Sequence, residues 1–84
     1  MRPYRLIRHA AEVLDERGIE RAWLEAALTE PDRQDTDPRY PARIRHWKKI
    51  AANGDRWLRV VYEIVDEELV VITVFFDRNE GRRA

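Results

Sequence analysis

The apolar positions at the start of the chain change from the spacing of a strand to that of a helix. Residues 4–8, which follow Pro3, have the composition of a short strand. From His9 onward the apolar groups recur at intervals of three and four residues: Ala10, Val13, Leu14 and the aliphatic stem of Arg17. This period places them on one face of a helix. We therefore predict a strand followed directly by an amphipathic helix.

A second helix is expected after a glycine. Gly18 stands where a helix commonly ends in the left-handed conformation, and Ile19 can fold back onto the last turn. A second apolar stripe predicts a helix over about residues 20–29 and consists of Trp23, Leu24, Ala27 and Leu28. Pro31 ends this helix. The two helices are expected to form an αα-hairpin hinged at Gly18.

The second half of the chain has the patterns of strands and tight turns. Residues 31–41 are polar and contain three prolines, so we expect a surface loop. Strands are predicted over residues 43–52, 57–65 and 69–76. The first two flank Asn53-Gly54, a strong hairpin signal, and the last two flank a tight turn at Asp66-Glu67. The nearly continuous apolar run of the last strand is typical of a strand that is central or covered on both faces.

The predicted order is β-α-α-β-β-β, which belongs to the α+β class. We expect the two-helix hairpin to pack on one face of a four-stranded antiparallel sheet, in which strands two to four form a meander. Residues 1–84 are expected to form a single domain whose charged tail, residues 79–84, is frayed.

Length and composition exclude several classes of function. Eighty-four residues are too few for a doubly wound nucleotide-binding domain or a barrel enzyme. The chain has no cysteine and no serine, which excludes cysteine-ligated metals and a serine triad. Since His9 and His46 are far apart and no cluster has ligand spacing, we expect no metal and no cofactor. No apolar stretch approaches the roughly 18 residues of a membrane span, and the absence of cysteine fits a cytoplasmic protein.

The net charge is zero, but the charges are segregated along the chain. Residues 1–37 hold six basic and nine acidic side chains (net −3), and residues 38–59 hold seven and one (net +6). Residues 60–77 hold five acidic side chains and no basic one, and residues 78–84 carry +2. Zero net charge gives no general attraction to nucleic acid. We therefore look for function first in the basic segment, residues 38–59.

One predicted strand within this segment combines cations with an indole. Alternation along the strand sends Arg43, Arg45, Trp47 and Lys49 to one face. Three cations around an indole suit phosphate contacts together with base stacking, so these four residues are the predicted nucleic-acid-binding site. The same pattern also fits a solvated sheet face, on which Arg and Lys stems cover the tryptophan and pair with acidic neighbours.

Five motifs, in their order and spacing, resemble a family of small bacterial proteins. They are Arg8-His9, Glu16-Arg17-Gly18-Ile19, Glu30-Pro31-Asp32, Arg59-Val60-Val61-Tyr62 and Val71-Ile72-Thr73-Val74. The family is known only as domain of unknown function 4258, and its name implies no activity. Its β-α-α-β-β-β order resembles in turn the RelE/ParE-like and BrnT-type toxins, which are ribonucleases or gyrase-directed proteins. That likeness concerns the fold and does not by itself confer a function.

The resemblance to the toxins implies candidate catalytic residues. In RelE-like ribonucleases, basic residues on the sheet stabilise the charge of the reacting phosphate while another side chain activates the 2′-hydroxyl. By position, Lys48, Arg59 and Arg78 could supply the charge, and His9 or His46 the general base or acid. We take His9, Lys48 and Arg59 as the catalytic candidates. His9 also fits a structural role at the start of the first helix. Tyr62, in the middle of an apolar strand, is expected in the core.

Two functions follow from these observations. The first is a toxin-like factor directed at RNA or the ribosome, with endoribonuclease activity as one form. The alternative is a non-catalytic protein-binding or regulatory module of the same fold, and the sequence does not decide whether the protein is an enzyme. The expected partners are accordingly RNA, the ribosome, an antitoxin-like protein or a second copy of the chain, and not a membrane. An open edge strand of the sheet would suit either protein partner.

Overall fold

The computed structural model describes residues 3–83 of the chain and the side chains of residues 3–80. Its elements are β1 (Tyr4–Leu6), α1 (Arg8–Glu16), α2 (Arg21–Thr29), β2 (Arg33–Thr36), β3 (Ile44–Ile50), the 3-10 turn η1 (Ala51–Asn53), β4 (Arg56–Val65), β5 (Glu68–Phe76) and α3 (Arg78–Arg83). The α+β class and the two-helix hairpin are confirmed.

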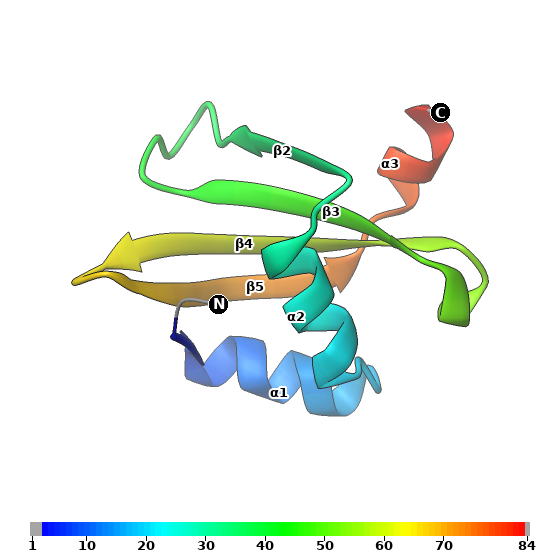
Figure 1. The fold of residues 1–84 in the computed structure, drawn as a ribbon, viewed down its shortest axis with the longest axis horizontal. Helices are drawn as coiled ribbons and strands as arrows, with labels where there is room; N and C mark the ends of the chain where they lie inside the picture. The colour runs from blue at the N-terminus through cyan, green and yellow to red at the C-terminus, as the bar shows by residue number, and fades with distance from the viewer. Residues whose placement is uncertain (1–2, 84) are drawn as a thin grey trace.

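The strands form one five-stranded sheet in the order β1-β5-β4-β3-β2. The expected meander is present as β3, β4 and β5, whose neighbours pair antiparallel. Two expectations were wrong: the sheet has five strands rather than four, and β1 pairs with β5 in parallel. In Figure 1, α1 and α2 lie against one face of the sheet, whereas α3 lies on the other side.

The main core lies between the helix hairpin and the sheet. Its fully buried side chains include Leu24 of α2, Leu58 and Val60 of β4, and Val71 and Val74 of β5. The opposite face of the sheet also has a buried layer, made of Trp47, Val61 and Val70. This second layer explains why the sequence of β5 is apolar almost throughout.

The hinge between α1 and α2 has the geometry that the sequence predicts. Gly18 adopts a φ of 63°. The Ile19 N–H donates to the Leu14 carbonyl at 2.9 Å and the Gly18 N–H to the Asp15 carbonyl at 3.3 Å. These two bonds define a Schellman motif, which satisfies carbonyls at the end of α1. Ile19 is thereby turned into the core, where it is buried.

The additional strand β2 lies within the segment expected to be a surface loop. It carries no apolar alternation, since its sequence is Arg-Gln-Asp-Thr. What holds it is its register with β3, in which Arg33 lies opposite Trp47 and Asp35 opposite Arg45. Cross-strand pairs between opposite charges stabilise a sheet as apolar pairs do. The residues that pair with β2 lie in β3, so the sequence of β2 alone does not indicate a strand.

The two connections between β3, β4 and β5 differ in kind. Asp66 and Glu67 form the expected two-residue turn between paired Val65 and Glu68, with φ values of 50° and 66°. The Asn53-Gly54 hairpin is longer than predicted, because η1 occupies residues 51–53 and both Gly54 and Asp55 have positive φ.

Candidate functional site

The basic strand β3 does not present a free aromatic ring. Trp47 is only 2% exposed. The guanidinium of Arg33 lies 3.7 Å from the centre of its ring, and those of Arg45 and Arg59 lie at 5.3 and 5.6 Å. The Trp47 Nε1 donates to Asp77 Oδ2 at 3.1 Å. Arginine stems therefore cover this tryptophan, which leaves no ring face for a nucleobase.

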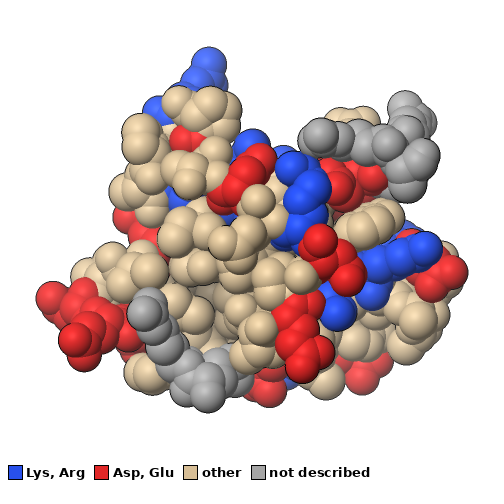
Figure 2. Space-filling view, turned by 45° about the horizontal axis from the view of Figure 1, so that its top comes forward, with Lys and Arg blue, Asp and Glu red and all other residues tan. Residues whose placement is uncertain are grey.

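The arginines of this face are paired with carboxylates. Arg45 donates two hydrogen bonds to Asp35, at 2.7 and 2.8 Å, and Arg43 donates one to Glu63 at 3.2 Å. Arg59 lies 3.7 Å from Asp77. Lys49 is exposed. Figure 2 shows one view of the whole surface, in which basic and acidic atoms likewise stand side by side.

Carboxylates on this face are held in their charged form. Hydrogen bonds from Arg45 lower the pKa of Asp35, and the charge of Arg33 adds to this effect. Burial acts to raise the pKa of Asp77, but hydrogen bonds from Trp47 and from the Glu80 and Asn79 amides outweigh it, so its pKa is also lowered. These contacts describe a neutralised, solvated sheet face. Nucleic-acid binding by Arg43, Arg45, Trp47 and Lys49 stays a prediction without support from them.

The three catalytic candidates lie at separate places. Lys48 is opposite Leu58 in the register of β3 and β4, on the helix side of the sheet, and lies 3.9 Å from Asp32. Arg59 is opposite Trp47, on the other side. His9 lies on α1, which packs against β5 and not against β3. The fold does not bring these three side chains to one reaction centre.

His46 is enclosed in the core between β3 and α2. Its Nδ1 lies 2.9 Å from the Ala27 carbonyl and its Nε2 lies 3.0 Å from the Tyr62 hydroxyl. A carbonyl can only accept, so Nδ1 carries the proton and Nε2 accepts from Tyr62. Burial lowers the pKa of His46. Tyr62 is buried as expected, and this pair has a structural role.

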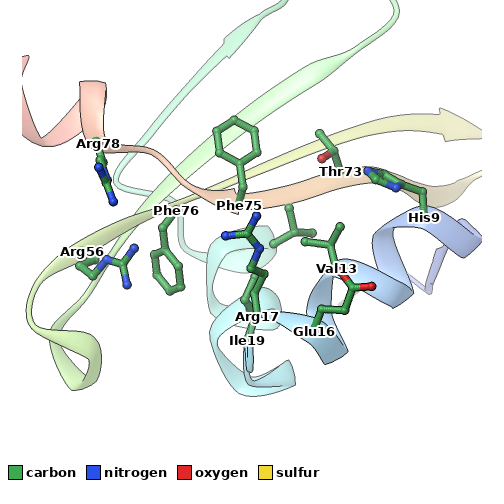
Figure 3. A pocket seen from close by; sticks show the side chains of 11 residues that line it. His9, Val13, Glu16, Arg17, Ile19, Arg56, Thr73, Phe75, Phe76 and Arg78 are labelled. Carbon is green, nitrogen blue, oxygen red and sulfur yellow. The ribbon is translucent and has the colours of Figure 1, made fainter.

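A cavity of about 630 Å³ lies between α1 and the end of β5, within the size range of ligand sites. Three arginines line it together with the first catalytic candidate: Arg17, Arg56, Arg78 and His9. In Figure 3, His9 lies beside Thr73 at one end, and Arg56 and Arg78 lie beside Phe76 at the other. Arg17 extends from the end of α1 toward β5 between these ends. A second hollow of about 240 Å³ continues past Arg56 and Arg78.

The arginines of this cavity differ from those of β3 in having no acidic partner. Within residues 3–80, no carboxylate lies within 4.0 Å of the guanidinium nitrogens of Arg17, Arg56 or Arg78. Arg56 stacks on the Phe76 ring at 4.4 Å. All three side chains are exposed, and Glu16 is the one carboxylate among the cavity-lining residues. The cavity is therefore a locally basic site in a protein of zero net charge.

The same cavity borders an open edge of the sheet. Strand β1 pairs only with residues 69–71 of β5, and its last hydrogen bond runs from the Ile7 N–H to the Val71 carbonyl at 3.1 Å. The chain then turns into α1. Within the described part of the chain, no strand lies beside residues 73–76 on this edge. We call the cavity and this edge the β5-edge groove.

Backbone groups point out of the sheet along this groove. The Asp77 N–H donates to the Trp57 carbonyl at 2.8 Å, which is on the β4 side. Peptide groups of successive residues in a strand point to opposite sides. Phe76 and Val74 therefore direct their N–H and C=O groups away from β4. Val74 is 0% exposed as a whole residue, so its peptide groups are enclosed, whereas Phe76 is partly exposed.

The comparisons with known proteins identify the family. Residues 6–76 match the family described as Domain of unknown function (DUF4258), which is most of the chain. The chain belongs to this family. Comparisons with curated proteins and with solved structures found no match, and the likeness to RelE/ParE-like and BrnT-type toxins is not supported by them.

The described part of this DUF4258 protein has neither a membrane-spanning helix nor a cluster of metal-ligating side chains. Between residues 3 and 83, no helix is long and apolar enough to cross a membrane. In the same described region, no three His, Asp or Glu side chains are grouped to hold a metal ion.

The β5-edge groove of this DUF4258 protein was only partly visible in the sequence. His9 and Arg78 were candidates by position, but Arg17 was assigned to the apolar stripe of a helix and Arg56 to the basic segment. One signal was available in the sequence. Because Arg17 and Gly18 end the first helix, Arg17 had to lie at the edge of the two-helix layer. The point at which β1 stops along β5 depends on tertiary packing, and no residue pattern indicated it.

Proposed function

We propose that this protein is a non-catalytic protein-binding module that accepts an extended segment of a partner as an additional strand along residues 73–76. The observation that carries the proposal is the unpaired outer edge of β5, which borders a cavity large enough for side chains of the added strand. Strand addition uses main-chain hydrogen bonds for affinity and side-chain pockets for specificity.

The groove has the parts that this mode of binding needs. The outward peptide group of Phe76 offers one donor and one acceptor, whereas Val74 is fully buried. The added strand would continue the line of β1 and lie over the side of α1 that carries His9, Val13 and Arg17. Four residues of strand span about 13 Å, so we expect a short contact of modest affinity.

Amide hydrogen exchange with a captured partner tests this function. In the free protein the Phe76 amide should exchange quickly, and those of Thr73 and Phe75 slowly, because the latter two face β4. A bound partner should slow exchange at Phe76. Strand β2 lies at the opposite edge of the sheet and serves as the internal control. A stoichiometric complex in which β2 is protected and residues 73–76 are unchanged would refute the proposal.

A toxin-like, RNA-directed activity is the second candidate function. One observation favours it, since His9 and Arg78 line the same cavity together with Arg17 and Arg56. A histidine beside several cations is a set that phosphodiester cleavage can use. The test is expression in bacteria: growth arrest with cleaved RNA, relieved by His9→Gln together with Arg78→Gln, would favour this activity. Normal growth at high expression, with intact ribosome-bound RNA, would exclude it.

A further inference from the structure

We infer that Asn53 is a site of spontaneous covalent modification, at which its side-chain amide is converted to a carboxylate through a cyclic imide formed with Gly54. The site lies in the turn between β3 and β4 and does not line the β5-edge groove, so the inference is independent of the proposed function. It is carried by the conformation and exposure of residues 51–55 and by the contrast with Asn79, the other asparagine of the chain.

The reaction needs only these two neighbouring residues and water. The main-chain nitrogen of Gly54 attacks Cγ of Asn53, so that a new C–N bond forms and the bond from Cγ to Nδ2 breaks. The amide group leaves as ammonia together with the proton of the Gly54 N–H, and a five-membered cyclic imide remains. Water then opens the ring at one of its two C–N bonds, which gives either aspartate or isoaspartate, in which the main chain runs through Cβ and Cγ. Neither step oxidises or reduces any group.

The backbone at Gly54 leaves the attacking nitrogen accessible. Gly54 has a φ of 64°, and no atom lies within 4 Å of the position that a Cβ would take. A glycine has no side chain to shield its nitrogen or to restrict rotation of the peptide unit. Gly54 and Asp55 are exposed, and Asn53 is partly exposed. Water can therefore reach both the amide and the cyclic intermediate.

The turn places little restraint on Asn53. For the attack, Asn53 has to leave the helical conformation of η1, which is a single 3-10 turn (Ala51–Asn53). Hydrogen bonds of 3-10 turns have poorer geometry than those of an α-helix, and exposed turns open locally at a low cost in free energy. Within residues 3–80, the Asn53 side chain has no hydrogen bond that would have to break. We therefore expect the folded protein to reach the reactive conformation often.

Asn79 lacks these features and serves as the internal control. The residue that follows it is Glu80, whose N–H donates to Asp77 Oδ1 at 3.3 Å. The Glu80 side chain is only 7% exposed and forms an ion pair with Arg33. Movement of this peptide unit toward Asn79 would disturb both contacts. We expect Asn79 to keep its amide under conditions in which Asn53 reacts.

The modification changes the charge and the length of the turn. Either product adds a negative charge two residues before Asp55. Isoaspartate also lengthens the main chain by one atom between Ile50 and Arg56, which pair across β3 and β4. The guanidinium of Arg56 stacks on the Phe76 ring at 4.4 Å and lines the β5-edge groove. A slow reaction at Asn53 therefore alters the segment that positions a residue of the groove.

Peptide mapping of aged protein tests the inference. The full-length chain is incubated in neutral and in mildly alkaline buffer, and its peptides are separated by chromatography and identified by mass spectrometry. We expect the mass increase of deamidation at Asn53 and not at Asn79. The rate should rise with pH, because the Gly54 nitrogen must lose its proton to attack. Two products should appear, and one of them should elute with the corresponding peptide of Asn53→Asp.

A variant and a peptide identify the cause. Asn53→Gln requires a six-membered ring, which forms more slowly, and should show no conversion. A blocked peptide of residues 50–56 gives the rate without the fold, and the folded protein should react within about tenfold of it. If Asn53 keeps its amide while the peptide is converted, the folded turn protects it and the inference is wrong. Equal conversion of Asn53 and Asn79 would show that neither Gly54 nor the turn directs the reaction, and would also overturn it.

Discussion

His46 connects three elements of the core through two hydrogen bonds. It stands on β3, its Nδ1 bonds the Ala27 carbonyl of α2, and its Nε2 bonds the Tyr62 hydroxyl of β4. Its ring also meets that of Tyr62 edge-on, with centres 4.9 Å apart. A neutral imidazole satisfies both bonds, whereas a charged one would have to be buried. His46, which the sequence offered beside His9 as a general base or acid, is thus a polar link within the core.

This burial predicts a pH dependence of stability. Burial lowers the pKa of His46 in the folded protein, while in the unfolded chain the imidazole titrates near its ordinary value of about 6.5. Below that pH the unfolded chain binds a proton that the folded protein does not, so acidification favours unfolding. We expect the free energy of unfolding, measured by urea titration, to be highest above about pH 6.5 and to fall toward pH 5.

The two histidines provide a matched pair for this measurement. His46→Gln should flatten the dependence between about pH 7.5 and pH 5, since no other described histidine is buried. His9→Gln replaces an exposed histidine and should leave the dependence unchanged. An unaltered pH profile in His46→Gln would contradict the assignment.

The ion pair of Glu80 with Arg33 leads to a second prediction about stability for a single residue. It accepts two hydrogen bonds from Arg33, at 2.8 and 2.9 Å, and is only 7% exposed. Glu80→Gln removes the charge from this buried pair and should lower the free energy of unfolding by about 1–3 kcal/mol. Glu12→Gln, in the exposed pair with Arg8, is the control and should have little effect. Equal losses in the two variants would show that the enclosed position of Glu80 adds nothing.

At the scale of elements, the turn between β4 and β5 contains a correctable strain. Asp66 and Glu67 both have positive φ, which costs a non-glycine residue about 1–2 kcal/mol. Asn-Gly is the preferred pair for such two-residue turns. Asp66→Asn with Glu67→Gly should raise the free energy of unfolding by about 0.5–1 kcal/mol, because relief of strain exceeds the entropy that glycine loses. The measurement is thermal unfolding.

Gly18→Ala is the reciprocal experiment. Gly18 has a φ of 63° and open space where a Cβ would stand. The substitution therefore introduces strain without a clash and should lower stability by about 1 kcal/mol. If the turn variant is destabilised, or if Gly18→Ala is neutral, then strain in left-handed backbone does not account for the stability changes at these positions.

The elements with a local signal could be predicted, and those defined by their partners could not. The α1–α2 hairpin follows from apolar period and a glycine, and the meander follows from three apolar strands and their turns. Strand β2 is polar and exists through the Asp35–Arg45 pairing. Residues 79–83 of the tail expected to be frayed lie in α3 (Arg78–Arg83), which the Arg33–Glu80 ion pair holds against the sheet. In both cases the stabilising contact joins residues distant in sequence.

At the scale of the whole molecule, folding rearranges the charge blocks of the sequence. The sheet places the basic strand β3 between β2 and β4, which carry Asp35 and Glu63. Two cations of the basic segment, Arg43 and Arg45, are thereby paired with carboxylates. The cations left without a partner in the groove come from three different blocks, through Arg17, Arg56 and Arg78. Charge patterning along the chain therefore does not show which cations are paired, because ion pairing is decided by strand order.

This arrangement predicts how salt affects self-association. The outward peptide group of Phe76 lies at an edge of the sheet, and we expect the arginines of the groove to oppose pairing of this edge with a second copy. At about 0.01 M salt the screening length is about 30 Å, and at 1 M it is about 3 Å. We expect sedimentation equilibrium to show a monomer at low salt and an increasing dimer fraction at high salt. R17Q/R56Q/R78Q should dimerise already at low salt. A dimer that forms at low salt and dissociates at high salt would instead require complementary charges, and would place the contact between copies away from this edge.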